Sequence, residues 1–270
     1  RCNGAAWELA NVDNIAVTAR ALSCDLDGLA PRLERVLREA RERNDQYALL
    51  MCRVGFCSLV WLAAGDPDEA RRQADAALAQ PFPATYTWPV YQGAVAHASI
   101  DLYLGDPRSA LGRIDAAWRT LQSSGMLRFQ MVRIELRDLR ARCALAIAVG
   151  ESCSAAERGR LLRDARRETA RIAREDLGWA TPVADALRGG IAAASGDAAA
   201  ARAALDRAAF GFEHLGMDLH AASVRLQLAT LLDDDDGARV SAEQRAWLTG
   251  RGVRDPEQLA AAVAPAVRIA

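Results

Sequence analysis

Apolar and polar positions along the chain repeat with the period of an α-helix, and Gly and Pro separate the periodic segments. Runs of Val, Ile and Thr that alternate every second residue, which predict β-strands, are nearly absent. We therefore expect an all-α protein that forms a single domain over residues 1–270. The predicted helices span residues 4–22, 29–44, 46–63, 67–79, 89–104, 107–123, 127–149, 155–175, 182–194, 198–215, 219–232, 241–249 and 256–263.

One short phrase occurs three times, in residues 62–78, 103–118 and 193–210: Gly-Asp, then an Ala five residues after the Gly, then an Ala seven residues later. Gly suits the left-handed backbone that ends a helix, and the Asp side chain caps the next helix by accepting a free backbone N–H. In the first copy, Pro67 fits the first helical position and Glu69 is placed to complete a capping box with the Asp. Each phrase therefore predicts a helix–turn–helix.

The two alanines of each phrase are two helical turns apart, so both lie on one face of the second helix. A small side chain there lets a neighbouring helix approach closely, as stacked antiparallel hairpins require. We expect the following alanines at helix crossings: Ala70 and Ala77, Ala110 and Ala117, and Ala201 and Ala208.

The repeated phrase resembles the second half of tetratricopeptide (TPR) repeats, which are two-helix units that stack into a superhelix. This resemblance implies a right-handed α–α superhelix, a TPR-like solenoid of about six antiparallel helical hairpins. The first-helix signature of the family is mostly missing: Trp61 stands at the Tyr-like place, whereas Asp101 and Ala192 do not match it. The glycines of successive phrases are 40 and 91 residues apart, against about 34 in a regular TPR.

A wider resemblance covers most of the chain. Residues 127–146 and 171–197 look like the C-terminal helical-repeat region of bacterial eukaryotic-like serine/threonine kinases and of STAND (signal-transducing ATPase) proteins, and 246–265 resembles the natural end of such chains. Residues 241–270 are accordingly expected to be C-terminal capping helices. Because the chain starts with Arg1 rather than Met, we expect it to be part of a longer signalling protein.

The composition narrows the range of functions. A net charge of −1 offers no basic surface for nucleic acid. No apolar run reaches the roughly 18 residues of a membrane-spanning helix, so we expect a cytoplasmic protein with neither a nucleic-acid nor a membrane partner. The chain has no Lys, which excludes a kinase or P-loop phosphate site in this segment. The six Cys form no C-x-x-C pair, and most of them are expected to be small buried hydrophobes.

No pattern of catalytic or metal-ligating residues is evident. His214 and His220 are better explained as polar residues near a turn than as a metal site, which needs further ligands. The run Asp-Asp-Asp-Asp-Gly at 233–237 places Leu232 where a calcium loop needs its first oxygen ligand, so we expect a solvated acidic turn. We therefore predict no cofactor, no metal and no enzymatic activity in this segment. An enzyme would need a deep polar pocket with a histidine or paired carboxylates.

TPR geometry, projected onto the first helix of each hairpin, gives a candidate binding surface on the inner curve. Its residues are small and apolar and lack the fixed donors that hold a peptide carboxylate. The curve is therefore either closed on itself as core or occupied by an apolar helix or a greasy ligand. The candidate residues are Leu59, Leu62, Gln92, Val95, Ser99, Leu102, Val183 and Ala186.

Two functions follow from these observations. The first is a protein-interaction and regulatory module of a bacterial signalling kinase or STAND ATPase, which binds a protein partner or upstream domains of the same chain. The alternative is a helical-repeat domain that senses a small, apolar molecule in a signalling or transcriptional regulator. The apolar inner curve and the nearby aromatic residues Tyr86, Trp88 and Tyr91 favour this alternative.

Overall fold

The computed structural model describes residues 3–23, 25–83, 85–232 and 234–267, and every regular element within these ranges is a helix. The prediction of an all-α protein is confirmed. None of these helices combines the length and the apolar character needed to cross a membrane. The α-helices are α1 (Asn3–Leu22), α2 (Leu26–Glu42), α3 (Gln46–Met51), α4 (Leu59–Ala63), α5 (Pro67–Leu78), α6 (Trp88–Tyr103), α7 (Pro107–Ser123), α8 (Gln130–Ala148), α9 (Ala155–Ile172), α10 (Ala180–Ala194), α11 (Ala198–His214), α12 (Asp218–Ala229), α13 (Asp234–Thr249) and α14 (Pro256–Val263), and the 3₁₀-helices are η1 (Gly55–Ser58) and η2 (Met126–Arg128).

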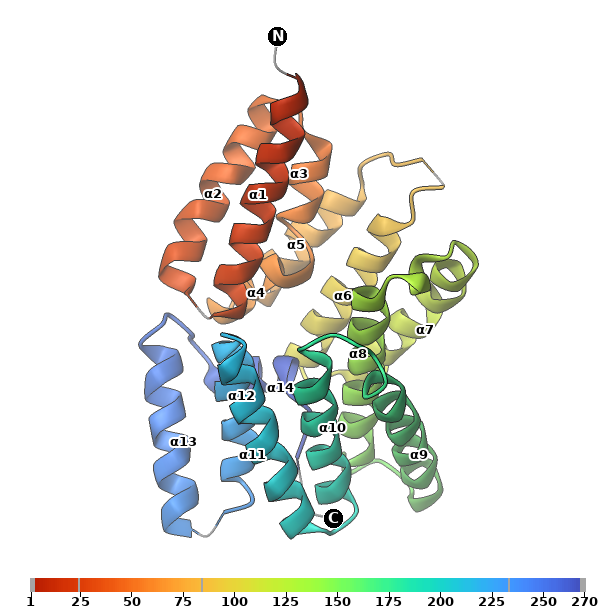
Figure 1. The fold of residues 1–270 in the computed structure, drawn as a ribbon, viewed down its shortest axis with the longest axis vertical. Helices are drawn as coiled ribbons and strands as arrows, with labels where there is room; N and C mark the ends of the chain where they lie inside the picture. Colours follow the sequence, from red (N-terminus) through yellow and green to blue (C-terminus); the bar gives the residue numbers. More distant parts are fainter. Residues whose placement is uncertain (1–2, 24, 84, 233, 268–270) are drawn as a thin grey trace.

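Helices that follow one another along the chain pack against one another, most extensively α6 on α7, α8 on α9, and α10 on α11. The chain begins with α1–α5 at one end of the molecule and passes along one side through α6–α9. It then returns with α10–α13, which lie below α1–α5 in Figure 1. The path therefore brings the first and last helices of the chain close together.

All three copies of the repeated phrase form the predicted turn. The backbone of Gly65, Gly105 and Gly196 has φ angles of 71°, 75° and 82°, a left-handed conformation that glycine adopts at low cost. The Asp that follows each glycine accepts a hydrogen bond from the backbone N–H three residues later, at 2.8, 3.0 and 3.0 Å. The three predicted caps are confirmed.

The capping box predicted in the first copy is wrong. The backbone N–H of Asp66 donates to the carbonyl of Trp61 at 2.8 Å, which is the bond that a left-handed glycine makes possible after the end of a helix. That donor is therefore not free for Glu69, whose carboxylate accepts hydrogen bonds from Arg72 and Gln73 instead.

The repeated alanines lie at helix crossings, as predicted. Five of the six are at most 1 % exposed, and Ala117 is half-buried against the core. Around the third copy, α10 and α11 approach so closely that a Cβ on Gly189 would lie 2.5 Å from Leu205 Cγ and 3.3 Å from the Ala201 carbonyl oxygen. Small residues on both helices are therefore a condition of this packing.

The predicted helix over 46–63 is interrupted. Helix α3 ends at Met51, and α4 begins only at Leu59. The cause is Gly55, whose φ of 60° lies outside the right-handed helical region. The side-chain oxygen of Gln92 lies 2.5 Å from the place that a Cβ of this glycine would take, so contact with α6 favours glycine there.

The predicted acidic turn at 233–237 is helical from Asp234 onward and forms the first turn of α13; Asp233 lies outside the described residues. Carboxylates in the first turn of a helix interact favourably with its positive end. The helical state thus suits the acidic run better than the loop that we predicted, and α13 starts seven residues earlier than the predicted 241–249.

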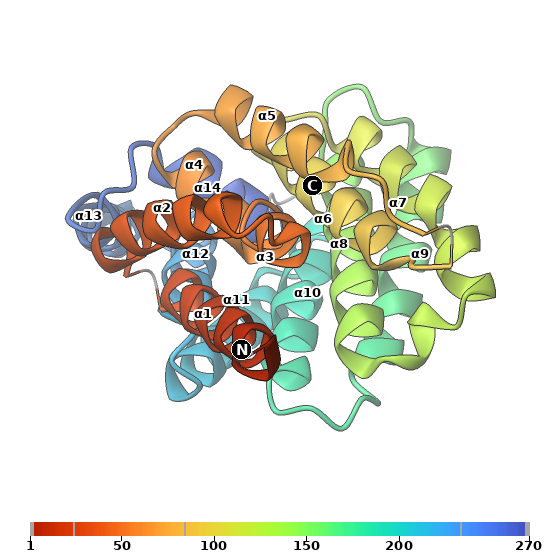
Figure 2. The same cartoon turned by 90° about the horizontal axis from the view of Figure 1, so that it is seen from above.

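The C-terminal residues join the two ends of the chain. Helix α14 packs against α12, α6 and α4, and α12 also contacts α1. Just before α14, the backbone N–H of Arg254 donates to the carbonyl of Ala63 at 2.8 Å. Figure 2 shows α14 between α4, α12 and α6. Of the expected capping segment 241–270, α13 covers α12, whereas α14 lies inside the molecule.

Replacing Ala201 with Phe should overpack the crossing of α10 and α11 and lower the free energy of unfolding by about 1–3 kcal/mol. The matched control is Ala199→Phe, an exposed position on the same helix, where a change within about 0.5 kcal/mol is expected. Urea unfolding measures both. Equal effects of the two substitutions would contradict the packing described for Ala201.

Candidate functional site

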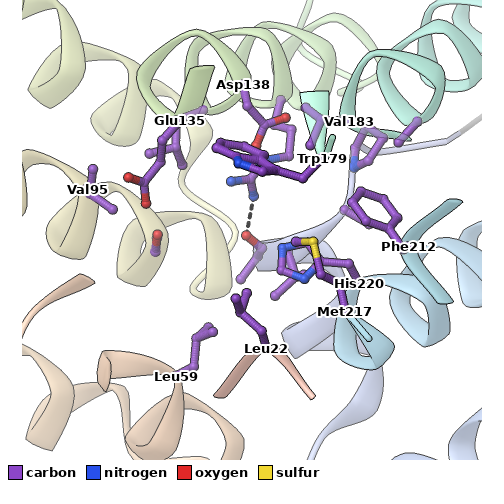
Figure 3. Close-up of a pocket in the computed structure, with 18 of the residues that line it drawn as sticks. Leu22, Leu59, Val95, Glu135, Asp138, Trp179, Val183, Phe212, Met217 and His220 are labelled. Carbon is purple, nitrogen blue, oxygen red and sulfur yellow. Dashed lines mark hydrogen bonds and ion pairs between the residues drawn. The ribbon is translucent and has the colours of Figure 1, made fainter. Parts of the chain in front are cut away.

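A cavity of about 220 Å³ lies at the centre of the molecule, where α1, η1, α4, α6, α8, α10, α11, α12 and α14 converge (Figure 3). Its lining is mostly apolar, and among the described lining residues the side chain of Met131 is the exposed one. The apolar lining includes Leu22, Leu59, Val95, Leu139, Val183, Ala186, Phe212, Met217 and Val224, together with the last two residues of α14 and the two that follow it, 262–265.

One wall of the cavity is polar and comes from a single face of α8. Glu135, Asp138 and Arg142 follow one another at spacings of three and four residues, so their side chains project on the same side of the helix. The Arg142 Nε–H donates to Asp138 Oδ2 at 2.8 Å, and its Nη1–H donates to the carbonyl of Ala262. Arg142 thus neutralises Asp138 and holds the end of α14.

Glu135 forms no ion pair with any of the residues that the structure describes. Its carboxylate accepts a hydrogen bond from the Tyr91 hydroxyl. Burial raises the pKa of Glu135 to about 7, Asp138 adds to the rise, and the Tyr91 hydrogen bond and the charge of Arg142 oppose it. Burial also raises the pKa of Asp138, against the effect of Arg142. Glu135 is therefore poised to gain or lose a proton near neutral pH.

His220, on α12, lies across the cavity from Glu135. Its ring centroid is 5.2 Å from that of Phe212, and its Nδ1 is buried without a hydrogen-bond partner among the described residues. Burial lowers the pKa of His220 to about 3, and the positive charge of Arg142 acts in the same direction. The imidazole is thus neutral at pH 7 and adds no charge to the cavity.

The structure brings together five of the eight residues predicted for the inner surface, namely Leu59, Val95, Ser99, Val183 and Ala186, which all line the cavity. Leu62, Gln92 and Leu102 do not line it: the two leucines are buried in the core, and Gln92 packs against Gly55. Of the predicted aromatic residues, Tyr91 reaches the polar wall through its hydrogen bond to Glu135.

The polar residues of the cavity were missed by the sequence analysis. Glu135, Asp138 and Arg142 share a helical face that also carries the buried Leu139, and this spacing was the available signal. His220 was interpreted as a residue near a turn, whereas it lines the cavity. The cavity therefore holds a histidine and two carboxyl groups, either of which an enzyme would need, but its lining is mostly apolar rather than polar.

These groups are not arranged as a nucleophile and its base. Of the hydroxyls that line the cavity, Ser58 donates to the carbonyl of Gly55. Within the part of the chain that the structure describes, no hydrogen bond joins a lining Ser or Thr to His220, Glu135 or Asp138, the pairing that activates a hydroxyl. The described residues also contain no group of three or more metal-ligating side chains. A mostly apolar cavity with a few polar groups suits the binding of a small molecule.

Comparisons of the chain with family models, with curated proteins and with solved structures each found no match. The proposed function therefore depends on the geometry of the cavity and on the residues that line it.

Two substitutions should change thermal stability in opposite ways with pH. The folded-state pKa of Glu135 lies above its ordinary value of 4.5, so the buried acid costs stability as pH rises from 4.5 through about 7. The folded-state pKa of His220 lies below its ordinary 6.5, so this residue costs stability as pH falls from 6.5 to about 3. Melting temperatures should show that Glu135→Gln gains more, relative to the wild type, at pH 8 than at pH 5. His220→Phe should gain more at pH 5 than at pH 8.

The exposed acid Glu42 is the control for both comparisons. Glu42→Gln is expected to give the same small change at pH 5 and pH 8. If Glu135→Gln behaves like Glu42→Gln, Glu135 is not a buried carboxyl group, and the description of the polar wall is wrong.

Proposed function

We propose that this chain is a ligand-binding regulatory domain whose central cavity takes a small, largely apolar molecule. The observation that carries the proposal is the enclosure of this cavity between helices from both ends of the chain, with a polar wall on α8 and apolar residues elsewhere. Pockets of this composition typically bind small molecules, in which the few polar groups set orientation.

The inner curve is poorly suited to a long peptide. Helix α14 already packs against α4, α6 and α12, and the backbone that follows it runs close to α10, with Pro265 Cβ and the Ala266 carbonyl oxygen 3.2 Å from the Cβ position of Gly190. The protein's own apolar helix thus fills the place that a partner helix would take in helix-in-groove binding. This favours the ligand-sensing alternative over a peptide-binding groove.

The proposal includes the finer architecture expected from the sequence, a right-handed TPR-like superhelix of about six hairpins. The three Gly-Asp turns and the buried alanines at fixed spacing support it. We propose further, as the wider sequence resemblance implies, that the chain belongs to a cytoplasmic bacterial signalling protein such as a serine/threonine kinase or a STAND ATPase. In that setting, ligand binding would regulate upstream domains rather than convert the ligand.

One observation favours a second role, contact with a protein or with other domains of the same chain. Val12 and Ile15 are 59 % and 67 % exposed and are three residues apart on α1, so they share a face of that helix. If this face docks upstream domains, Val12→Arg with Ile15→Arg should abolish their co-elution with the chain. Co-elution that is unaffected by the double substitution would contradict this role for the α1 face.

Filling the cavity should prevent ligand binding. Ala186 lines the cavity and is 4 % exposed, so Ala186→Leu places three more carbon atoms in the space that the bound molecule would occupy.

A metabolite screen by thermal shift identifies ligands, since a ligand that binds only the folded state stabilises it by about 2.7 kcal/mol at about 100 times its Kd.

The expected result is a ligand whose thermal shift is retained by Ala203→Leu, the same change at an exposed position of α11, and lost by Ala186→Leu. A shift that survives in Ala186→Leu would place the ligand elsewhere. A broad screen without any shift would contradict the binding function.

A further inference from the structure

The charges that line the cavity do not balance. Glu135 and Asp138 are acidic, and Arg142 is the one arginine among the described lining residues. Arg142 is occupied, because its guanidinium donates to Asp138 and to the carbonyl of Ala262. Glu135 is left with a neutral partner, the Tyr91 hydroxyl. Among the described residues, an ionised Glu135 therefore gives the cavity one negative charge that no neighbouring cation pairs with.

None of the other described elements that line the cavity supplies a cation for Glu135. The titratable or charged groups that face Glu135 are Tyr91 on α6 and, on its own helix, Asp138 and Arg142. Helices α1, α4, α10, α11 and α14 and the 3₁₀-helix η1 line the cavity with uncharged residues, and His220 on α12 is neutral at pH 7. Burying an unpaired carboxylate is costly unless a bound group brings the opposite charge.

The positions of the lining residues add a second requirement for the ligand, an apolar part beside the charged group. Figure 3 shows Glu135 beside Val95 at one end of the cavity, with Phe212 and Met217 at the other end. Glu135 is four residues, one helical turn, from Met131, the exposed residue of the described lining. A molecule that pairs with Glu135 would carry its charge at this end of the cavity and its apolar part toward the other end.

We propose that the cavity selects a small monocationic amine with an apolar body, whose ammonium group pairs with Glu135. This inference rests on the proposed ligand-binding function and assigns the chemical class of the ligand. The ammonium would donate to the Glu135 carboxylate while the Tyr91 hydroxyl keeps the carboxylate oriented. The apolar body would contact residues such as Leu59, Val183 and Phe212.

The test compares three probes of equal chain length, octylamine, 1-octanol and octanoate, by titration calorimetry on the full chain at pH 8. Octylamine should bind at least about tenfold more tightly than 1-octanol, because a charge-assisted hydrogen bond contributes more than a neutral one. Octanoate should bind more weakly than 1-octanol, since it meets an uncompensated carboxylate.

Glu135→Gln should remove the preference for the amine, so that octylamine binds no more tightly than 1-octanol, whereas the exposed control Glu42→Gln should keep the preference. The wild type provides an independent readout that needs no variant. Its affinity for octylamine should increase from pH 6 to pH 8 as Glu135 loses its proton, since the pKa of this acid is about 7. The affinity for 1-octanol should not increase over the same range.

The outcomes separate this inference from the function on which it rests. If 1-octanol binds as tightly as octylamine at pH 8, or Glu135→Gln keeps the amine preference, the amine assignment is overturned while ligand binding stands. If octanoate binds most tightly, the cavity selects anions and the assignment is also overturned. If none of the probes binds and the metabolite screen finds no ligand, both the ligand-binding function and the amine assignment fail.

Discussion

Packing of the eight-residue helix α14 against helices from both ends of the chain is the constraint on which the rest of this structure depends. Leu259 of α14 is 1 % exposed and belongs to a hydrophobic cluster that includes residues of α1–α8 as well as α12. A stack of helical hairpins by itself leaves its two ends apart, because each hairpin contacts mainly its neighbours. Here α14 and the Arg254–Ala63 backbone hydrogen bond connect the ends and enclose the central cavity.

Arg142 links this closure to the chemistry of the cavity. It is 8 % exposed, and its guanidinium holds both Asp138 and the last turn of α14. A buried guanidinium is stable only when its donors are satisfied, so the side chain has little freedom to pair with anything else. Among the described residues, Glu135 consequently has no cation to pair with, so the interaction that ties α8 to α14 leaves one carboxyl group available for the ligand that we propose.

The local features of the fold could be predicted from the sequence because they depend on neighbouring residues. The left-handed turns at Gly65, Gly105 and Gly196 and their Asp caps needed no information from distant parts of the chain. The break at Gly55 was not predicted, because a glycine inside a helical pattern is often tolerated and its positive φ is not evident from the sequence. The place of α14 depends on contacts with distant helices, which no local pattern indicates.

The apolar part of the candidate site was predictable only in part. TPR geometry identified five lining residues, four of them apolar, including Val95 and Ala186, but none of the apolar residues from α1, α8, α11, α12 or α14. The polar wall was not predicted. TPR geometry was applied only to the first helices of three hairpins, and α8 is not one of these helices. The role of His220 likewise depends on α12 returning to α1, which no local pattern in the sequence indicates.

Hydrogen–deuterium exchange on a variant that loosens α14 tests the central claim most directly. Leu259→Ala should cost about 2–5 kcal/mol of local packing and should speed amide exchange in α1 and α4 as well as in α12 and α14, because these elements share one interface. Leu161→Ala, the same change at a 2 % exposed position of α9, should leave α1 and α4 unaffected. Faster exchange confined to α14 in the Leu259→Ala protein would contradict the account, since the contact between the two ends of the chain would then not depend on this helix.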